Sequence, residues 1–146
     1  MLKEFNIYEE GLKGDHLGLQ VLSADEFNQA HELISRFSTL TNAGEIHNRR
    51  NNIYRFNEPV MSQGISVRGV EIFEPKPNAN LRALKPGIEH LAFMVDDFDS
   101  YYEQCLNKGV PIDKMLTFDS GSKFFKTKLV NMVEVEFRND FLGDRL

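Results

Sequence analysis

The chain has 146 residues, 41% of them hydrophobic and 27% charged, which predicts one soluble globular domain with a sizeable core. Its formal net charge of −5 at pH 7 argues against a nucleic-acid partner, because phosphates carry the same sign. No apolar run approaches the roughly 18 residues that cross a bilayer, and the N-terminal stretch lacks the apolar core of a signal peptide. Since Cys105 is the only cysteine, no intrachain disulfide can form, and we expect a cytoplasmic protein without a membrane partner.

The first predicted elements are a strand and a helix. The segment DHLGLQV (15–21) alternates apolar and polar residues as a strand does. The segment SADEFNQAHELISRF (23–37) predicts an amphipathic helix, and Ser23 with Glu26 three residues later forms a capping box at its start. The apolar side of this helix is expected to consist of Phe27, Ala30, Leu33, Ile34 and Phe37.

Strands and a linker follow this helix. The stretch EIHNRR leads into NIYRFN, and ISVRGVEIF (65–73) has the strongest strand pattern in the first half of the chain. The next segment, EPKPNANLRALKPG (74–87), holds three of the five prolines and predicts a linker with a short helical turn near 81–84.

The same order of elements recurs after the linker. The segment IEHLAFMV (88–95) predicts a strand, and DDFDSYYEQCLNKGV (96–110) predicts a helix that begins after Asp96 or Asp97 and stops at Gly109. The stretches KMLTFD, KFFKTKLV and NMVEVEFR then predict three further strands.

The two halves are therefore an internal repeat. Sliding the chain by 74 positions brings DHLGLQV onto EHLAFMV, so that His16 coincides with His90. We expect an α+β fold of two βαβββ repeats, whose sheets form one curved, mostly antiparallel sheet around a central cup. A single domain would span 1–146, with repeat one at about 14–74, the linker at about 75–87 and repeat two at about 88–138.

Strand alternation places polar residues on the face away from the helices. His16 shares that face with Gly18, and His90 shares it with Ala92, so a small residue leaves room beside each imidazole. Alternation in the last strand of each half assigns Glu71, and in the second half Glu134 and Glu136, to the same face.

These side chains predict a metal site. Two imidazoles and one or two carboxylates that converge in a cup form a mixed nitrogen and oxygen ligand set for a divalent ion. The alternative is a pair of solvent-facing polar sheet surfaces, which antiparallel sheets commonly have. His31 and His47 have no such repeat partners, and we expect them to be structural or exposed.

With these repeats and histidines the chain resembles the vicinal oxygen chelate superfamily, which includes glyoxalase I, extradiol dioxygenases and the fosfomycin- and bleomycin-resistance proteins. The resemblance covers about 14–138 and is carried by DHLGLQV, EHLAFMVDDFD and NMVEVEF. Within it, RFNEPV (55–60), VEIFEPKP (70–77) and GIEHLAFMV (87–95) are most similar to the uncharacterised YecM-like branch.

The resemblance implies one metal ligand from the first and last strand of each repeat. In this sequence the implied ligands are His16 and Glu71 from the first repeat, and His90 with Glu134 or Glu136 from the second. In the family's closing motif an asparagine lies three residues before the ligand glutamate, so Asn131 favours Glu134. The chain departs from the family in lacking the Asp-Pro-Asp-Gly turn, in its long linker and in its N-terminal extension, and it has no recognisable thiol-peptide recognition set. Many relatives dimerise, so a homodimer is a further expectation.

Such a site predicts a metal-dependent lyase or isomerase that acts on a small oxygenated metabolite. A divalent ion (Zn²⁺, Ni²⁺, Mn²⁺, Co²⁺ or Fe²⁺) polarises a carbonyl and stabilises an enolate-like intermediate, and Glu71 or Glu134 would be the base. An iron-dependent dioxygenase and a metal-free small-molecule-binding protein are the alternatives.

Other side chains receive secondary roles. Arg55 and Arg68 are candidates for binding an anionic substrate, although a surface ion pair is the more common fate of an arginine. Phe73, Met94 and Phe125 are candidates for an apolar wall, while Cys105 is expected to be a small buried hydrophobe.

Overall fold

The computed structural model describes residues 12–62, 64–113, 115–128 and 133–142. The first repeat consists of β1 (Lys13–Gln20), α1 (Ala24–Ile34), β2 (Ser38–Ile46), β3 (Arg49–Ser62) and β4 (Ile65–Phe73). The second consists of β5 (Gly87–Met94), α2 (Phe98–Asn107), β6 (Leu116–Thr117), β7 (Lys123–Lys128) and β8 (Glu134–Arg138). Both repeats therefore have the predicted βαβββ order.

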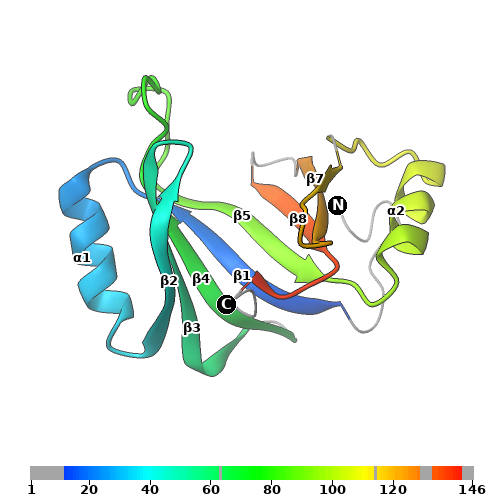
Figure 1. Ribbon diagram of the computed structural model, residues 1–146, viewed down its shortest axis with the longest axis horizontal. Helices are drawn as coiled ribbons and strands as arrows, with labels where there is room; N and C mark the ends of the chain where they lie inside the picture. The colour runs from blue at the N-terminus through cyan, green and yellow to red at the C-terminus, as the bar shows by residue number, and fades with distance from the viewer. Residues whose placement is uncertain (1–11, 63, 114, 129–132, 143–146) are drawn as a thin grey trace.

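The eight described strands form one curved sheet in the order β2-β3-β4-β1-β5-β8-β7-β6, with the helices at its two ends (Figure 1). The first strand of each repeat runs parallel to the last, as β1 with β4 and β5 with β8. The antiparallel pair of β1 and β5 joins the two repeats edge to edge. The predicted fold class, with its mostly antiparallel sheet, is confirmed.

Helix α1 begins where the sequence predicts and ends three residues early. The Glu26 amide donates to Ser23 Oγ at 3.1 Å, while the Glu26 carboxylate accepts from the Leu22 amide at 2.7 Å, one residue before the position expected for a capping box. A turn after Ile34 redirects the chain into β2, so the apolar side of α1 that packs on the sheet is shorter than predicted. Leu33 and Phe37 remain 56% and 46% exposed.

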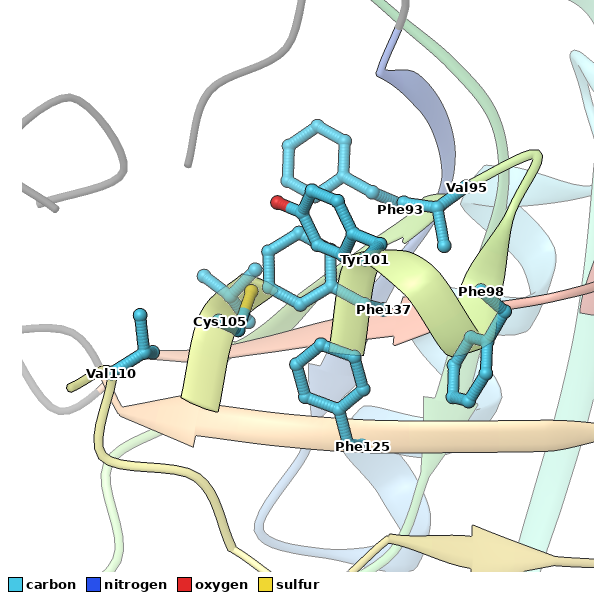
Figure 2. Packing of buried hydrophobic residues seen from close by; sticks show 9 residues of the cluster. Phe93, Val95, Phe98, Tyr101, Cys105, Val110, Phe125 and Phe137 are labelled. Carbon is cyan, nitrogen blue, oxygen red and sulfur yellow. The ribbon is translucent and has the colours of Figure 1, made fainter. Parts of the chain in front are cut away.

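Each helix packs on the sheet face that alternation predicts. Leu17, Leu19, Val70 and Ile72 contact the buried side of α1. Under α2, aromatic and aliphatic side chains form the second core, shown in Figure 2. Phe125 lies fully buried in that core, with its ring tilted against those of Phe98 and Tyr101, so it is a core residue, the more common role of an aromatic in a sheet, and does not line the cup. Cys105 is buried there too, as expected.

The hairpin between β2 and β3 is longer than the sequence pattern indicates. His47 and Asn48 form its turn with φ angles of 53° and 57°, the left-handed pair that a two-residue hairpin turn requires. His47 is exposed there, as expected for a histidine outside the site. Neither helix of the described chain has the length and apolar character needed to cross a membrane.

Candidate metal centre

Three side chains from three neighbouring strands meet on the sheet face that lies opposite the helices. His16 Nε2 of β1 is 3.1 Å from His90 Nε2 of β5. The Glu71 carboxylate of β4 lies 3.3 Å from His90 Nε2 and 3.8 Å from His16 Nε2. Both histidines are buried, with only 2% and 3% of their surface exposed. The solvent-facing alternative is therefore wrong for these residues.

Strand register explains why these residues converge. Gly18 of β1 is paired with Glu71 on one side and with His90 on the other. A Cβ atom added to Gly18 would overlap the His90 imidazole, so the absence of a side chain at this position makes space for that ring. Alternation predicts that Gly18 leaves room beside His16 of its own strand, and the structure shows that the space it leaves is filled by His90 of the neighbouring strand.

The donor set fits a divalent cation. Ligands at about 2.0–2.2 Å from one ion and at roughly right or tetrahedral angles lie about 3.0–3.5 Å apart, close to the separations found here. His16, Glu71 and His90 each offer one ligand atom to this cluster, which could hold a metal ion. Two imidazole lone pairs facing each other at 3.1 Å also repel unless a proton or a cation lies between them.

The electrostatic interactions within the cluster favour an ionised, negatively charged Glu71 carboxylate and a positive charge on the neighbouring His90. Burial by itself would raise the pKa of Glu71, but hydrogen bonding to His90 and the charge of His16 outweigh burial and lower this pKa to about 2. Burial would lower the pKa of His90, but hydrogen bonds to Glu71 and Glu89 prevail and raise it to about 9. The Asn51 amide also donates to Glu71 Oε1 at 2.7 Å.

The last strand of the second repeat carries two candidate glutamates. In β8, Glu134 is paired with His90 and Glu136 with Ala92, whereas in β4 Gly69 is paired with His16 and Glu71 with Gly18. By this register Glu136, and not Glu134, is the counterpart of Glu71.

The two glutamates differ in their surroundings. Glu134 accepts a hydrogen bond from Lys126 Nζ at 3.3 Å. Glu136 is buried against the guanidinium of Arg138 and lies 3.4 Å from Lys126. Burial raises the pKa of Glu136, but Arg138 and the neighbouring positive groups hold it below its usual value. Asn131, which favours Glu134 in the sequence motif, lies outside the described residues.

A small recess, with a cavity volume of about 20 Å³, adjoins His16 on the side of β3 and β4. Its lining includes both predicted anion-binding residues, Arg55 and Arg68, together with Asp15 and Phe141. The Arg68 guanidinium lies 4.0 Å from the centre of the Phe141 ring. Cationic groups thus line a space that borders one of the candidate ligands.

An aromatic side chain borders the site on its other side. The Phe73 ring lies parallel to the His90 imidazole, with a centroid separation of 5.9 Å, and Arg49 covers the Phe73 ring at 4.4 Å. This contact places the predicted wall residue Phe73 beside the site, where its side chain is buried. Met94 is half-buried at the end of β5.

The structure adds charged residues that the sequence interpretation missed. Asp15 and Glu89 accept hydrogen bonds from the two histidines, and Lys126 and Arg138 hold Glu136. The sequence did contain a signal for the two acids, because each stands immediately before a repeated histidine. His31 lies apart from the site, with its Nδ1 2.7 Å from the Tyr54 hydroxyl, as expected for a structural histidine.

Comparisons with known proteins identify the fold. No protein-family model matches the chain, and no curated protein matches it in sequence. The structural genomics protein EC4020 is similar over 94% of this chain and 76% of its own, with a TM-score of 0.74 and 15% identity.

Two methylmalonyl-CoA epimerases are also similar. The one from Streptomyces coelicolor, in complex with 2-nitronate-propionyl-CoA, covers 88% of this chain and 97% of its own (TM-score 0.64, 19% identity). The one from Mycobacterium tuberculosis covers 86% of each (TM-score 0.63, 16% identity). At these identities the comparisons show a shared fold, the one predicted from the resemblance to the vicinal oxygen chelate superfamily.

Proposed function

We propose that this protein is a metal-dependent enzyme of the isomerase or lyase type that acts on a small oxygenated metabolite with an anionic group. The observation that carries the proposal is the buried cluster of His16, Glu71 and His90, whose ligand atoms lie within 4.8 Å of one another. The three groups face one another, and a divalent cation between them would accept the imidazole lone pairs and neutralise the carboxylate at once.

We propose Glu136 as the fourth ligand, with Glu134 as the alternative. Strand register supports Glu136, since it is the counterpart of Glu71 in the second repeat. Lys126 and the Arg138 guanidinium would orient its carboxylate, as residues behind a metal ligand commonly do. The closing motif with Asn131 supports Glu134 instead.

When bound, a divalent ion supplies Lewis acidity toward a substrate carbonyl. The residues of the chain supply the remaining steps: Arg55 and Arg68 orient an anionic group of the substrate from the recess beside His16. Glu134 or Glu71 removes the proton next to the carbonyl. If Glu136 is the fourth metal ligand, Glu134 does not bind the metal and is the stronger candidate for the base.

The similar structures with a named activity support a reaction of this kind. Methylmalonyl-CoA epimerases share the fold, and epimerisation removes and returns a proton at the carbon beside a carbonyl. The YecM-like affiliation rests on the sequence segments 55–60, 70–77 and 87–95 and remains part of this proposal.

Metal content and metal-dependent stability test the proposal. The protein purified without chelators should retain a divalent ion, measured by elemental analysis. A metal at a hundredfold excess over its Kd should raise the free energy of unfolding by about 2.7 kcal/mol. His90→Ala and Glu71→Ala should abolish that increase, whereas His31→Ala should keep it. A protein that retains no metal and does not respond to added divalent ions would refute the enzyme proposal and leave the metal-free binding protein.

Matched amide variants decide between the two glutamates. Glu136→Gln should weaken Zn²⁺ or Co²⁺ binding at least tenfold in isothermal titration calorimetry, because it removes an anionic ligand. Glu134→Gln should keep the affinity within about threefold and lower turnover, because it removes the base. The reverse pattern would make Glu134 the ligand.

An iron-dependent dioxygenase is a second candidate, favoured by one observation. Two histidines and one glutamate are the donor set of the facial triad that binds Fe²⁺ in non-haem oxygenases. Loading with Fe²⁺ under nitrogen and then admitting oxygen separates the two: a dioxygenase consumes oxygen only with iron, whereas an isomerase works equally with redox-inert Zn²⁺ or Mg²⁺.

The homodimer expected from the resemblance stays a prediction, and sedimentation velocity would test it.

A further inference from the structure

An acidic residue stands directly before each histidine of the candidate site, and both carboxylates reach the imidazole that follows them. Asp15 Oδ2 accepts from His16 Nδ1 at 2.8 Å. Glu89 Oε2 accepts from His90 Nδ1 at 3.4 Å. In a regular strand, adjacent side chains point to opposite faces of the sheet, so these contacts need an interruption of the strand pattern.

Two β-bulges in the pairing of β1 with β5 supply that interruption. Asp15 and His16 together oppose the single residue Ala92, because the register shifts between Gly14 and Leu17. Glu89 and His90 together oppose Gly18, because the register shifts again between Gly18 and Leu19. Bulges of this kind redirect side chains and occur next to active sites. Each bulge therefore brings the acidic side chain to the face that its neighbouring histidine occupies.

The consequence for each imidazole is a fixed tautomer. A carboxylate that accepts from Nδ1 keeps the hydrogen on that nitrogen, and in the neutral ring the lone pair is then on Nε2. In both histidines, Nε2 is the atom that points into the cluster with Glu71. The hydrogen-bonding pattern thus prepares two nitrogen ligands that face the same point.

We propose that Asp15 and Glu89 are positioning residues that hold His16 and His90 as Nε2 ligands, an inference that rests on the metal site of the proposed function. The bulges are the structural device that makes this arrangement occur twice in one sheet. Neither acid belongs to the proposed ligand set, and each acts in this role through the histidine that follows it.

The two acids are not equally constrained. Asp15 is 3% exposed, also accepts from the Leu142 amide at 3.0 Å, and lies 3.9 Å from Arg138 Nε. The Glu89 side chain is 37% exposed, and its hydrogen bond to the histidine is longer. Asp15 therefore holds its histidine more firmly than Glu89 does.

Amide variants with a matched control test this inference. Asp15→Asn should weaken Zn²⁺ and Co²⁺ binding 10- to 100-fold, the usual effect of changing the residue behind a histidine ligand, and Glu89→Gln should weaken it less than tenfold. Asp140→Asn, which removes a charge near Arg138 without touching a histidine, should stay within threefold of the parent. Affinities come from isothermal titration calorimetry at one pH.

A spectroscopic signature separates positioning from a general structural effect. In a ¹H–¹⁵N spectrum of the Zn²⁺-loaded parent, His16 should show a protected, downfield Nδ1–H signal, and this signal should move upfield in Asp15→Asn. If the parent binds metal and Asp15→Asn keeps its affinity and its Nδ1–H signal, the inference is wrong and the proposed function stands. An equal loss in Asp140→Asn also overturns the inference. A parent that binds no divalent metal overturns the proposed function, and this role with it.

Discussion

The two repeats share one backbone plan but differ in the charges around their equivalent carboxylates. In repeat one, Glu71 interacts with two titratable imidazoles and one neutral amide. In repeat two, Glu136 is held by Arg138 and Lys126, two cations with high pKa values that burial alone would lower. Duplication thus fixes where each carboxylate lies in the sheet, while the neighbouring side chains decide which charges that carboxylate faces.

The largest expected difference between the repeats comes from deleting each carboxylate in metal-free protein at pH 8. Glu136→Ala should lower the free energy of unfolding by about 3–5 kcal/mol, because the buried Arg138 cannot release its charge. Glu71→Ala should cost only about 1–2 kcal/mol, because His90 can lose its proton instead. Urea denaturation measures both. Equal costs would show that the two carboxylates have the same role.

The pH dependence of the metal-free protein isolates repeat one. The pKa of Glu71 is lowered from 4.5 to about 2, so its contribution is present above pH 4.5 and is lost as the pH falls through 2. The pKa of His90 is raised from 6.5 to about 9, so its contribution is complete below pH 6.5 and is lost as the pH rises through 9.

Stability should therefore be highest between pH 4.5 and 6.5 and fall by about 3 kcal/mol by pH 9, since both shifts describe one interaction. Chemical denaturation in the presence of a chelator measures this decline. In Glu71→Gln the decline should become shallower, because His90 loses the largest of the carboxylate interactions that raise its pKa, while Glu89 remains. A parent protein with constant stability from pH 6 to 9 would contradict the assigned interaction.

The small residues beside the histidines give a third comparison. Gly18→Ala should destabilise by roughly 1–3 kcal/mol and disturb metal binding, because the new methyl group collides with the His90 ring. Ala92→Gly, at the equivalent position of repeat two, should cost only about 0.5–1 kcal/mol through backbone entropy. Thermal unfolding and metal titration of both variants measure the contrast. A well-tolerated alanine at position 18 would mean that His90 occupies another rotamer.

Small effects, confined to stability, should come from two buried hydroxyls at equivalent register positions. Tyr54 is paired with Val70 and Thr127 with Val135. Tyr54→Phe loses contacts with His31 and Asn52, and Thr127→Val loses its bond to the Pro111 carbonyl. Each should cost about 1 kcal/mol without changing metal affinity. A loss of metal binding in Tyr54→Phe would connect His31 to the site.

The features that depend on periodicity were predictable from the sequence. Strand β4 matches its predicted bounds, 65–73. The apolar residues that alternate with the predicted polar face, among them Leu17, Val70 and Val135, lie in the cores under the helices, so burial agrees with the alternation. Convergence of His16, Glu71 and His90 followed from the same alternation applied to two copies of one unit.

The features that break periodicity could not be predicted. Alternation places Asp15 on the face opposite His16, and only the bulge brings the two together. Glu136 and Arg138 are two residues apart on one strand face, so alternation predicts that they lie close together. Whether the two side chains form an ion pair depends on their rotamers and burial, which the sequence pattern does not contain. The early end of α1 likewise reflects the start of β2, a tertiary requirement that local helix propensity does not contain.

The candidate site lies where β1 of the first repeat pairs with β5 of the second, so separating the two repeats would also separate the ligands. A chain cleaved within the proline-rich linker would give two fragments, each with one imidazole on a newly unpaired edge strand. Mixing the fragments would restore that strand pair and rebuild the ligand cluster in the same event. Zn²⁺ should then promote complementation of the two fragments, so that reassembly itself reports on the metal.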